Sequence, residues 1–207
     1  MKKFFDQLNQ KYNESFVNFP WHDKHHLASW SAQTHYFTKH ITRIMAMCSA
    51  NCKFEYEELH KFFIEHLREE FGHHIIAQKD VEKLGYNLES FPELPGTRLL
   101  YEPQYFKALQ NPISFYGFGL MLEWLAVSIG TTVYKKVKDA GLESNFLKVH
   151  IKEDGDHSEK AEMLVKKFQQ DNVEEIKKNC LQTFVAYDLM LKEISQSVSF
   201  SKSKKVA

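Results

Sequence analysis

Apolar residues along most of this chain recur every three to four positions, which is the period of a helix that buries one face. Runs of β-branched residues, which would indicate strands, are missing, and proline and glycine are sparse. Asp23 has the side chain of a helix N-cap, and Gly85 is a residue that commonly ends helices. The pattern predicts an all-α fold of about seven helices, at 3–16, 23–51, 55–85, 102–109, 111–141, 143–170 and 173–196.

Short polar or proline-containing segments separate the predicted helices. Pro20 lies in a turn at 18–21, a second proline-containing loop covers 91–96, and Asp171 with Asn172 breaks the last long segment. No internal repeat or domain boundary is evident. We therefore expect residues 1–207 to form a single helical domain, with a disordered tail at about 198–207.

The composition excludes several classes of protein. Lys plus Arg number 27 and Asp plus Glu number 27, so the chain has no net positive field to hold nucleic acid. No run reaches the roughly 18 to 20 apolar residues of a membrane helix, and the N-terminal lysines precede no apolar signal segment. Three cysteines do not make a disulfide framework. We expect a cytoplasmic protein that binds neither nucleic acid nor a membrane.

The strongest chemical signal is the sequence from His150 to His157. Asp154 and His157 follow His150 by four and seven positions, so the three side chains share one face of a helix. Two imidazoles and a carboxylate on one face suit a metal such as iron or zinc. The alternative is a solvated polar face, because many neighbouring residues are charged.

A second signal lies late in the helix predicted at 55–85. Glu70 and His73 have the Glu-x-x-His spacing that four-helix di-iron proteins project into their cores. Glu69 with His73, and Glu70 with His74, are pairs at a spacing of four, and the sequence does not choose among them. The alternative is an exposed charged band.

The third signal is Glu123, which lies in the most apolar stretch of the chain. A lone carboxylate in a buried helix is costly unless it is paired or binds a metal. We therefore expect Glu123 to be a metal ligand, and a buried hydrogen-bonded acid or ion pair is the alternative. The three segments together offer a mixed nitrogen and oxygen donor set that suits iron, with zinc or manganese as weaker alternatives.

The order of these motifs resembles that of the haem-oxygenase-like non-haem di-iron oxidases. Their helical fold is shared with haem oxygenases, TenA proteins and the PQQ-synthesis protein C, and they include the chlamydial protein associating with death domains. The resemblance covers roughly residues 20–195. It implies a metal-ligand set of Glu70, His73, Glu123, His150, Asp154 and His157, with His66, Glu69 and His74 as less certain members. His66 could supplement or replace the first glutamate, because it lies one turn earlier on a similar face.

The resemblance implies two iron ions, cycling between Fe(II) and Fe(III), that activate O₂ to oxidise a small organic substrate. Manganese is an alternative metal. Fatty acids, amino acids and tyrosine-derived compounds are the substrate classes of the family, and a homodimer is the family expectation. Such a substrate needs an apolar, aromatic pocket. Candidate walls are Trp30, Tyr36, Phe71, Tyr116 and Trp124.

Two other functions fit the same scaffold. One is a metal-free, TenA-like enzyme of cofactor metabolism, which is disfavoured because no cysteine has an obvious nucleophile context. The other is a protein-interaction module. Iron content separates the oxidase from both.

Overall fold

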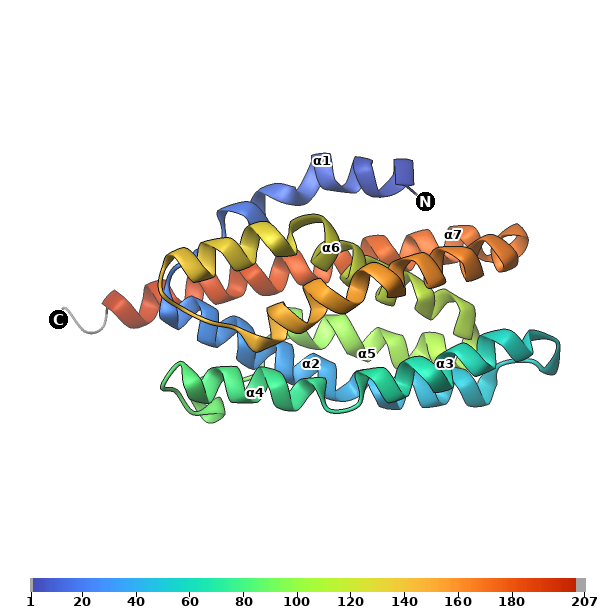
Figure 1. Ribbon diagram of the computed structural model, residues 1–207, viewed down its shortest axis with the longest axis horizontal. Helices are drawn as coiled ribbons and strands as arrows, with labels where there is room; N and C mark the ends of the chain where they lie inside the picture. The colour runs from blue at the N-terminus through green and yellow to red at the C-terminus, as the bar shows by residue number, and fades with distance from the viewer. Residues whose placement is uncertain (1, 204–207) are drawn as a thin grey trace.

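The computed structural model describes the backbone of residues 2–203 and the side chains of residues 4, 5, 7, 8, 14–151 and 172–197. Every regular element in this part of the chain is helical, which confirms the all-α prediction (Figure 1). The seven α-helices are α1 (Lys2–Asn18), α2 (Lys24–Asn51), α3 (Glu57–Glu70), α4 (His73–Lys83), α5 (Pro95–Gln110), α6 (Tyr116–Asp139) and α7 (Asn145–Ser203). Short 3₁₀ helices lie at Phe54–Tyr56, Leu88–Ser90 and Pro112–Phe115.

Helix α2 is the centre of the fold, because it packs against α3, α4, α5 and α7. Every residue from 26 to 34 is buried, as expected for a helix surrounded by others. The buried Gln33 amide is hydrogen-bonded at both ends: it accepts from Leu94 N and Thr97 Oγ1 and donates to the Pro92 carbonyl. This bonding ties the 91–96 loop to the central helix.

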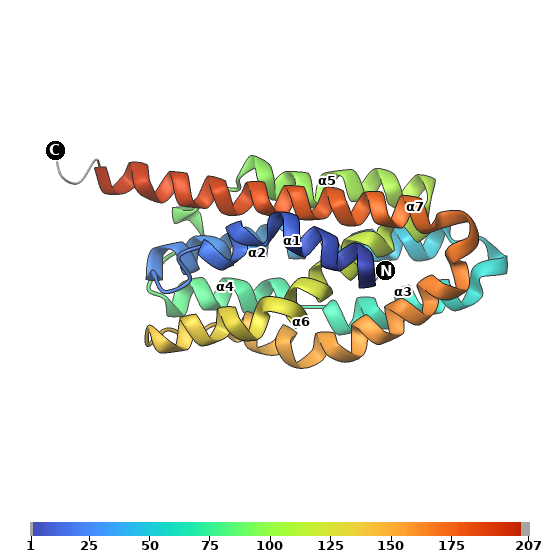
Figure 2. The same ribbon diagram turned by 90° about the horizontal axis from the view of Figure 1, so that it is seen from above.

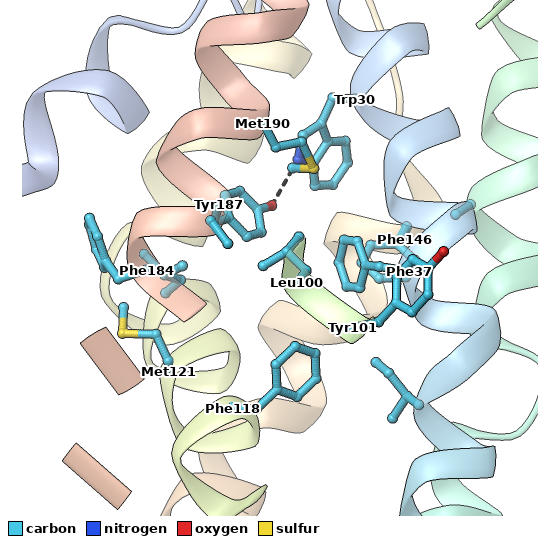
Figure 3. Close-up of a cluster of buried hydrophobic side chains, with 14 of the residues drawn as sticks. Trp30, Phe37, Leu100, Tyr101, Phe118, Met121, Phe146, Phe184, Tyr187 and Met190 are labelled. Atoms are coloured by element: carbon cyan, nitrogen blue, oxygen red, sulfur yellow. Dashed lines mark hydrogen bonds between the residues drawn. The ribbon is translucent and has the colours of Figure 1, made fainter. Parts of the chain in front are cut away.

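The apolar core lies between α2, α6 and the two ends of α7. Figure 3 shows Trp30 and Phe37 of α2 grouped with Phe118 of α6 and Tyr187 of α7, all buried. Each large side chain buried in this way stabilises the fold by roughly 1.5–3 kcal/mol relative to an exposed one. Gly117 allows α6 to approach α7 closely, because a Cβ there would lie only 2.2 Å from the Ile176 carbonyl oxygen.

Helix α7 doubles back on itself. Trp30 packs edge-on against Phe146 and donates a hydrogen bond to Tyr187, although these two residues are far apart in α7. A straight helix would separate them by about 60 Å. Figure 2 shows that the ribbon of α7 reverses direction, so that its red C-terminal part runs back along the molecule. The sequence predicted that the helix breaks at Asp171 and Asn172. This prediction is wrong, because α7 is helical throughout and changes direction without a break.

Helix α6 is the most apolar helix of the described chain. The segment Pro112–Asp139 is long and apolar enough to cross a membrane by length and composition, in contrast to the expectation from the sequence. Within the fold, 61% of its most apolar window is buried. A core helix meets the same criterion, and α6 packs along α7 in this way.

Local signals determine several helix ends. Asp23 is the N-cap of α2, because its Oδ1 accepts from the backbone N–H groups of His25 and His26, each at 3.0 Å. Helix α4 ends just before Gly85, which has a left-handed φ of 78°. Helix α5 begins at Pro95 rather than at the predicted 102, because proline suits the first turn of a helix, where its missing N–H costs nothing.

Folding stability should depend on pH through His40. Its ring stacks on Tyr101 with centroids 3.8 Å apart, and its Nδ1 lies 2.8 Å from the Tyr105 hydroxyl. Burial, reinforced by Lys39 and Arg43, lowers the pKa of His40 from 6.5 to about 4. The folded state favours the neutral ring, so this stability is present above pH 6.5 and lost as pH falls toward 4.

Urea unfolding at several pH values measures this loss. After allowance for solvent screening, we expect His40 to contribute about 1–2 kcal/mol to the decrease in unfolding free energy between pH 7 and pH 4. The variant His40→Gln should show a correspondingly shallower decrease. Equal slopes in both proteins would contradict the prediction.

Candidate metal centre

The junction of α3 and α4 brings Glu70 and His73 together. The sequence placed both residues on one helix, but α3 ends at Glu70 and α4 begins at His73. Phe71 is extended and Gly72 has a left-handed φ of 98°, a conformation that glycine adopts without strain. The turn places Glu70 Oε2 3.0 Å from His73 Nδ1. The expectation of a single helix over 55–85 is therefore wrong, and Gly72 is the signal that could have corrected it.

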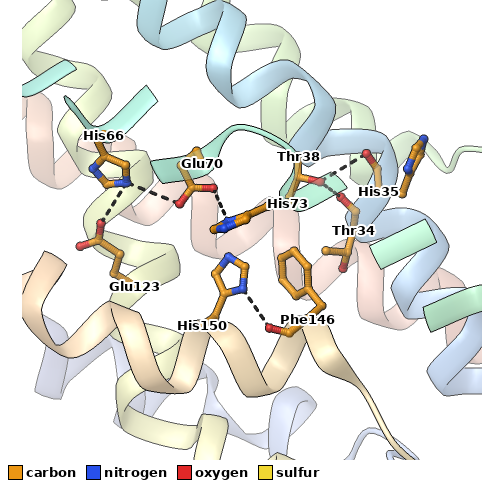
Figure 4. A network of polar contacts seen from close by, with 9 residues as sticks. All are labelled: Thr34, His35, Thr38, His66, Glu70, His73, Glu123, Phe146 and His150. Carbon is orange, nitrogen blue, oxygen red and sulfur yellow. Dashed lines mark hydrogen bonds and ion pairs between the residues drawn. The ribbon is translucent and has the colours of Figure 1, made fainter. Parts of the chain in front are cut away.

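His66 lies one turn before Glu70 in α3 and faces two carboxylates (Figure 4). Its Nε2 is 3.5 Å from Glu70 Oε1 and 3.8 Å from Glu123 Oε1. The residue is only 6% exposed, so this contact takes place inside the protein. The structure therefore brings His66, a less certain candidate in the sequence, into the same group as Glu70 and Glu123.

His150 approaches the same group from the first turns of α7. Its ring centroid lies 4.8 Å from that of His73, at a steep interplanar angle of 70°. Its Nδ1 is 2.9 Å from the Phe146 carbonyl oxygen. A carbonyl can only accept, so Nδ1 carries the hydrogen and Nε2 carries the lone pair that a metal would need. One donor atom each from Glu70, His73 and His150 lies within 4.8 Å of the others.

The remaining candidates fall into two groups. The side chains of Asp154 and His157 lie outside the described residues, although the backbone of both is part of α7. Glu69 is exposed, and His74 is half-buried against α2, where its carbonyl accepts from His35 Nδ1. Glu69 acts on the group through its charge, which contributes to the raised pKa of both His66 and Glu123.

Burial and mutual contacts shift the pKa values of the groups in this cluster. Burial alone would raise the pKa of Glu70, but hydrogen bonds from His66 and His73 outweigh it and hold that pKa well below its usual range. Burial raises the pKa of Glu123 to about 7, although His66 opposes this shift. Burial likewise disfavours a charged His66, but the adjacent Glu70 and Glu123 raise its pKa overall.

The donors present fit a divalent transition metal. Three imidazoles and two carboxylates supply the nitrogen and oxygen atoms that iron accepts. Glu123 is only 7% exposed, and its Oε2 has no hydrogen-bond partner among the described residues. A buried carboxylate oxygen without a donor is costly, and a bound cation would remove that cost.

A cavity opens beside these side chains. Its volume is about 120 Å³, which is enough for several waters or one slender organic molecule. His66, Glu70, Glu123 and His150 contribute to its wall, and most of the remaining wall is apolar. The arrangement can therefore hold an apolar molecule next to a metal site.

Most residues expected to line a substrate pocket lie elsewhere, and only Trp30 of the five contributes to the described wall of this cavity. Phe71 is 76% exposed, because the extended turn directs it away from the core. Tyr36 donates to the Leu88 carbonyl, Trp124 stacks on Phe5, and Tyr116 packs against Phe62. The wall instead includes Trp21, Phe146 and Tyr187, which only the tertiary structure brings together.

Comparisons with known proteins agree with this picture. The sequence model of a family described as iron-containing redox enzymes matches residues 28–189, a span that includes every candidate ligand named above. The fold is similar to that of a domain of unknown function with a haem oxygenase-like fold from Shewanella denitrificans OS217. The two chains superpose with a TM-score of 0.87 and are 20% identical, over 98% of this chain and 94% of that one.

No curated protein shows significant sequence similarity to this chain. The structural likeness establishes a single haem oxygenase-like helical domain, and the family match covers most of the sequence. On these findings, the chain belongs to the family of iron-containing redox enzymes.

Proposed function

We propose that this protein is a two-iron oxidase that uses O₂ to oxidise a small, largely apolar organic molecule. The position of Glu70 carries the proposal. Its Oε1 faces His66, while its Oε2 faces His73, so one buried carboxylate lies between two sets of donors. A carboxylate with one oxygen toward each set is suited to bridge two metal ions.

The residues divide naturally around Glu70. His73 and His150 lie on one side, and His66 with Glu123 on the other. Asp154 and His157 are further candidates from the sequence. Two ferrous ions held by these groups would supply electrons for the reduction of O₂.

The other parts of the site serve binding. The mostly apolar cavity beside His150 would hold an organic substrate next to the metal ligands. The Phe146 carbonyl fixes the orientation and tautomer of His150. The cysteines do not support a thiol-based reaction, because burial raises the pKa of Cys52 to about 11 and of Cys180 to about 12.

The first test is iron stoichiometry after anaerobic loading with Fe(II), followed by optical spectroscopy when O₂ is added. We expect about two irons per chain and a change in the visible spectrum. A chain that binds no iron under these conditions would overturn the proposal. Attention would then turn to metal-free enzymes or to protein partners.

The variant Glu123→Gln separates metal binding from folding. We expect it to lower the stoichiometry from about two irons to about one, because an amide is a poor iron ligand. The metal-free variant should nevertheless be more stable than the parent at pH 8, by about 1–2 kcal/mol, because a buried charge with an unpartnered oxygen is removed.

Urea unfolding of both metal-free proteins measures the difference in stability. Glu69→Gln is the matched control, because Glu69 is the exposed neighbour of Glu70. It should change neither iron content nor stability by a measurable amount. A Glu123→Gln variant that keeps both irons would remove Glu123 from the proposed ligand set.

A further inference from the structure

We propose that Tyr187 and Trp30 form a hydrogen-bonding subsite in the cavity that accepts a neutral oxygen of the substrate, such as a carbonyl or ether. The use of this subsite by a substrate rests on the proposed oxidase function. The substrate would then be an apolar molecule that carries an uncharged hydrogen-bond acceptor. A plain hydrocarbon would leave the subsite unused, and a charged group would not suit it.

The geometry of the pair leaves one donor unused. Both rings line the cavity, and the indole Nε1 of Trp30 lies 2.8 Å from the Tyr187 hydroxyl oxygen. An indole N–H can only donate, so the phenol oxygen is the acceptor of this bond. The phenol hydrogen remains, and no group among the described residues accepts it. Tyr187 is only 8% exposed, so this donor is available to a molecule in the cavity rather than to bulk water.

The other side-chain donors in the apolar part of the cavity wall already form hydrogen bonds within the protein. Trp21 Nε1 donates to the Phe16 carbonyl at 2.8 Å, and Thr38 Oγ1 donates to the Thr34 carbonyl at 2.7 Å. Outside the candidate metal ligands, Tyr187 is therefore the one described wall residue with an uncommitted polar hydrogen. A buried donor without a partner is costly, and a ligand oxygen would satisfy it.

The charge of the wall restricts the ligand to a neutral acceptor. Neither lysine nor arginine contributes to the described wall of the cavity. Arg43 and Arg68, which could have paired with a carboxylate, are both exposed. A carboxylate at Tyr187 would be buried without a cation, whereas a carbonyl or ether oxygen needs only one hydrogen bond.

Distances also limit the length of the substrate. The Trp30 and Phe146 ring centroids are 6.0 Å apart, and those of Phe146 and His150 are 3.9 Å apart. The Trp30 and His150 rings are therefore no more than about 10 Å apart, which an extended chain covers in roughly eight bonds. The Tyr187 hydroxyl lies 2.8 Å from Trp30 Nε1, so the acceptor oxygen should lie within roughly a dozen bonds of the carbon beside His150.

Ligand binding to the metal-free protein tests the subsite separately from iron chemistry. The probes are 2-octanone and 2-methyl-1-octene, in which a methylene group replaces the ketone oxygen. Fluorescence of Trp21, which also lines the cavity, reports binding. The comparison uses Trp30→Phe as background, because Tyr187→Phe alone would leave the indole N–H as a substitute donor.

The ratio of the two affinities should favour the ketone about fivefold more in Trp30→Phe than in the double variant Trp30→Phe/Tyr187→Phe. Adding Tyr116→Phe to Trp30→Phe is the matched control, since Tyr116 is a buried phenol that does not line the cavity. It should leave the ratio unchanged. Equal ratios with and without the Tyr187 hydroxyl would overturn the proposal.

Infrared spectroscopy of 2-octanone bound to the unmodified protein gives a second measurement that needs no variant. The carbonyl band should lie at lower wavenumber than in an alkane solvent, and an unshifted band would overturn the subsite. If the Tyr187 hydroxyl had no effect on the preference for the ketone, and the unmodified protein still bound two irons, the subsite alone would be refuted. A retained preference in a protein that binds no iron would refute only the oxidase.

Discussion

Replacing Glu70 with alanine is expected to abolish iron binding on both sides of the centre. Glu70 is the one described residue whose two carboxylate oxygens face different histidines, His66 at 3.5 Å and His73 at 3.0 Å. A substitution at a shared ligand should therefore remove both metals rather than one. We expect iron affinity to fall by more than 100-fold, beyond the 10–100-fold typical of lost outer-shell partners.

Anaerobic calorimetry with Fe(II) and metal analysis of the purified variant measure this effect. Glu69→Ala is the matched control, because it removes an exposed carboxylate at the adjacent position. Its iron content should equal that of the parent protein. If Glu70→Ala kept one tightly bound iron, Glu70 would belong to a single site and the shared position would be refuted.

Replacing Asp80 with alanine is expected to cause the largest loss of folding stability. Asp80 is 1% exposed and joins α4 to the start of α7. Its carboxylate accepts from the backbone N–H groups of Asn145 and Phe146, at 3.0 and 2.9 Å, and from the Ser144 hydroxyl at 2.8 Å. Alanine would leave two buried donors and one half-buried donor unsatisfied, at a cost of about 3–5 kcal/mol.

The same contact should position the metal ligands. His73 begins α4 and His150 lies early in α7, so Asp80 connects the two helices that carry them. In Asp80→Asn, which keeps an acceptor oxygen, we expect about half the loss of stability and iron binding about 10-fold weaker.

Urea unfolding and iron titration measure both effects. Asp188→Ala is the control, because Asp188 pairs with Lys192 near the surface and should cost less than 1 kcal/mol. If Asp80→Ala behaved like Asp188→Ala, the contact with α7 would not be a principal tie between these helices.

Local sequence signals predicted the helices but not every boundary. Asp23 and Gly85 act within their own turns, through a capping side chain and a left-handed φ, so their effects follow from neighbouring residues alone. The apolar period continues across Gly72, so periodicity predicts one helix where the structure has α3 and α4. The reversal of α7 depends on packing between residues as distant as Phe146 and Tyr187.

The candidate metal centre shows the same division. By itself, the sequence determined that the chain is helical almost throughout and that Glu123 lies in apolar surroundings, because periodicity and composition are local properties. Tertiary structure alone decided that His66 and Glu70 of α3 face Glu123 of α6 and His150 of α7, and that Trp30 meets Tyr187 at a cavity. The physical reason is that these contacts join residues on different helices, and their geometry depends on how the helices pack together.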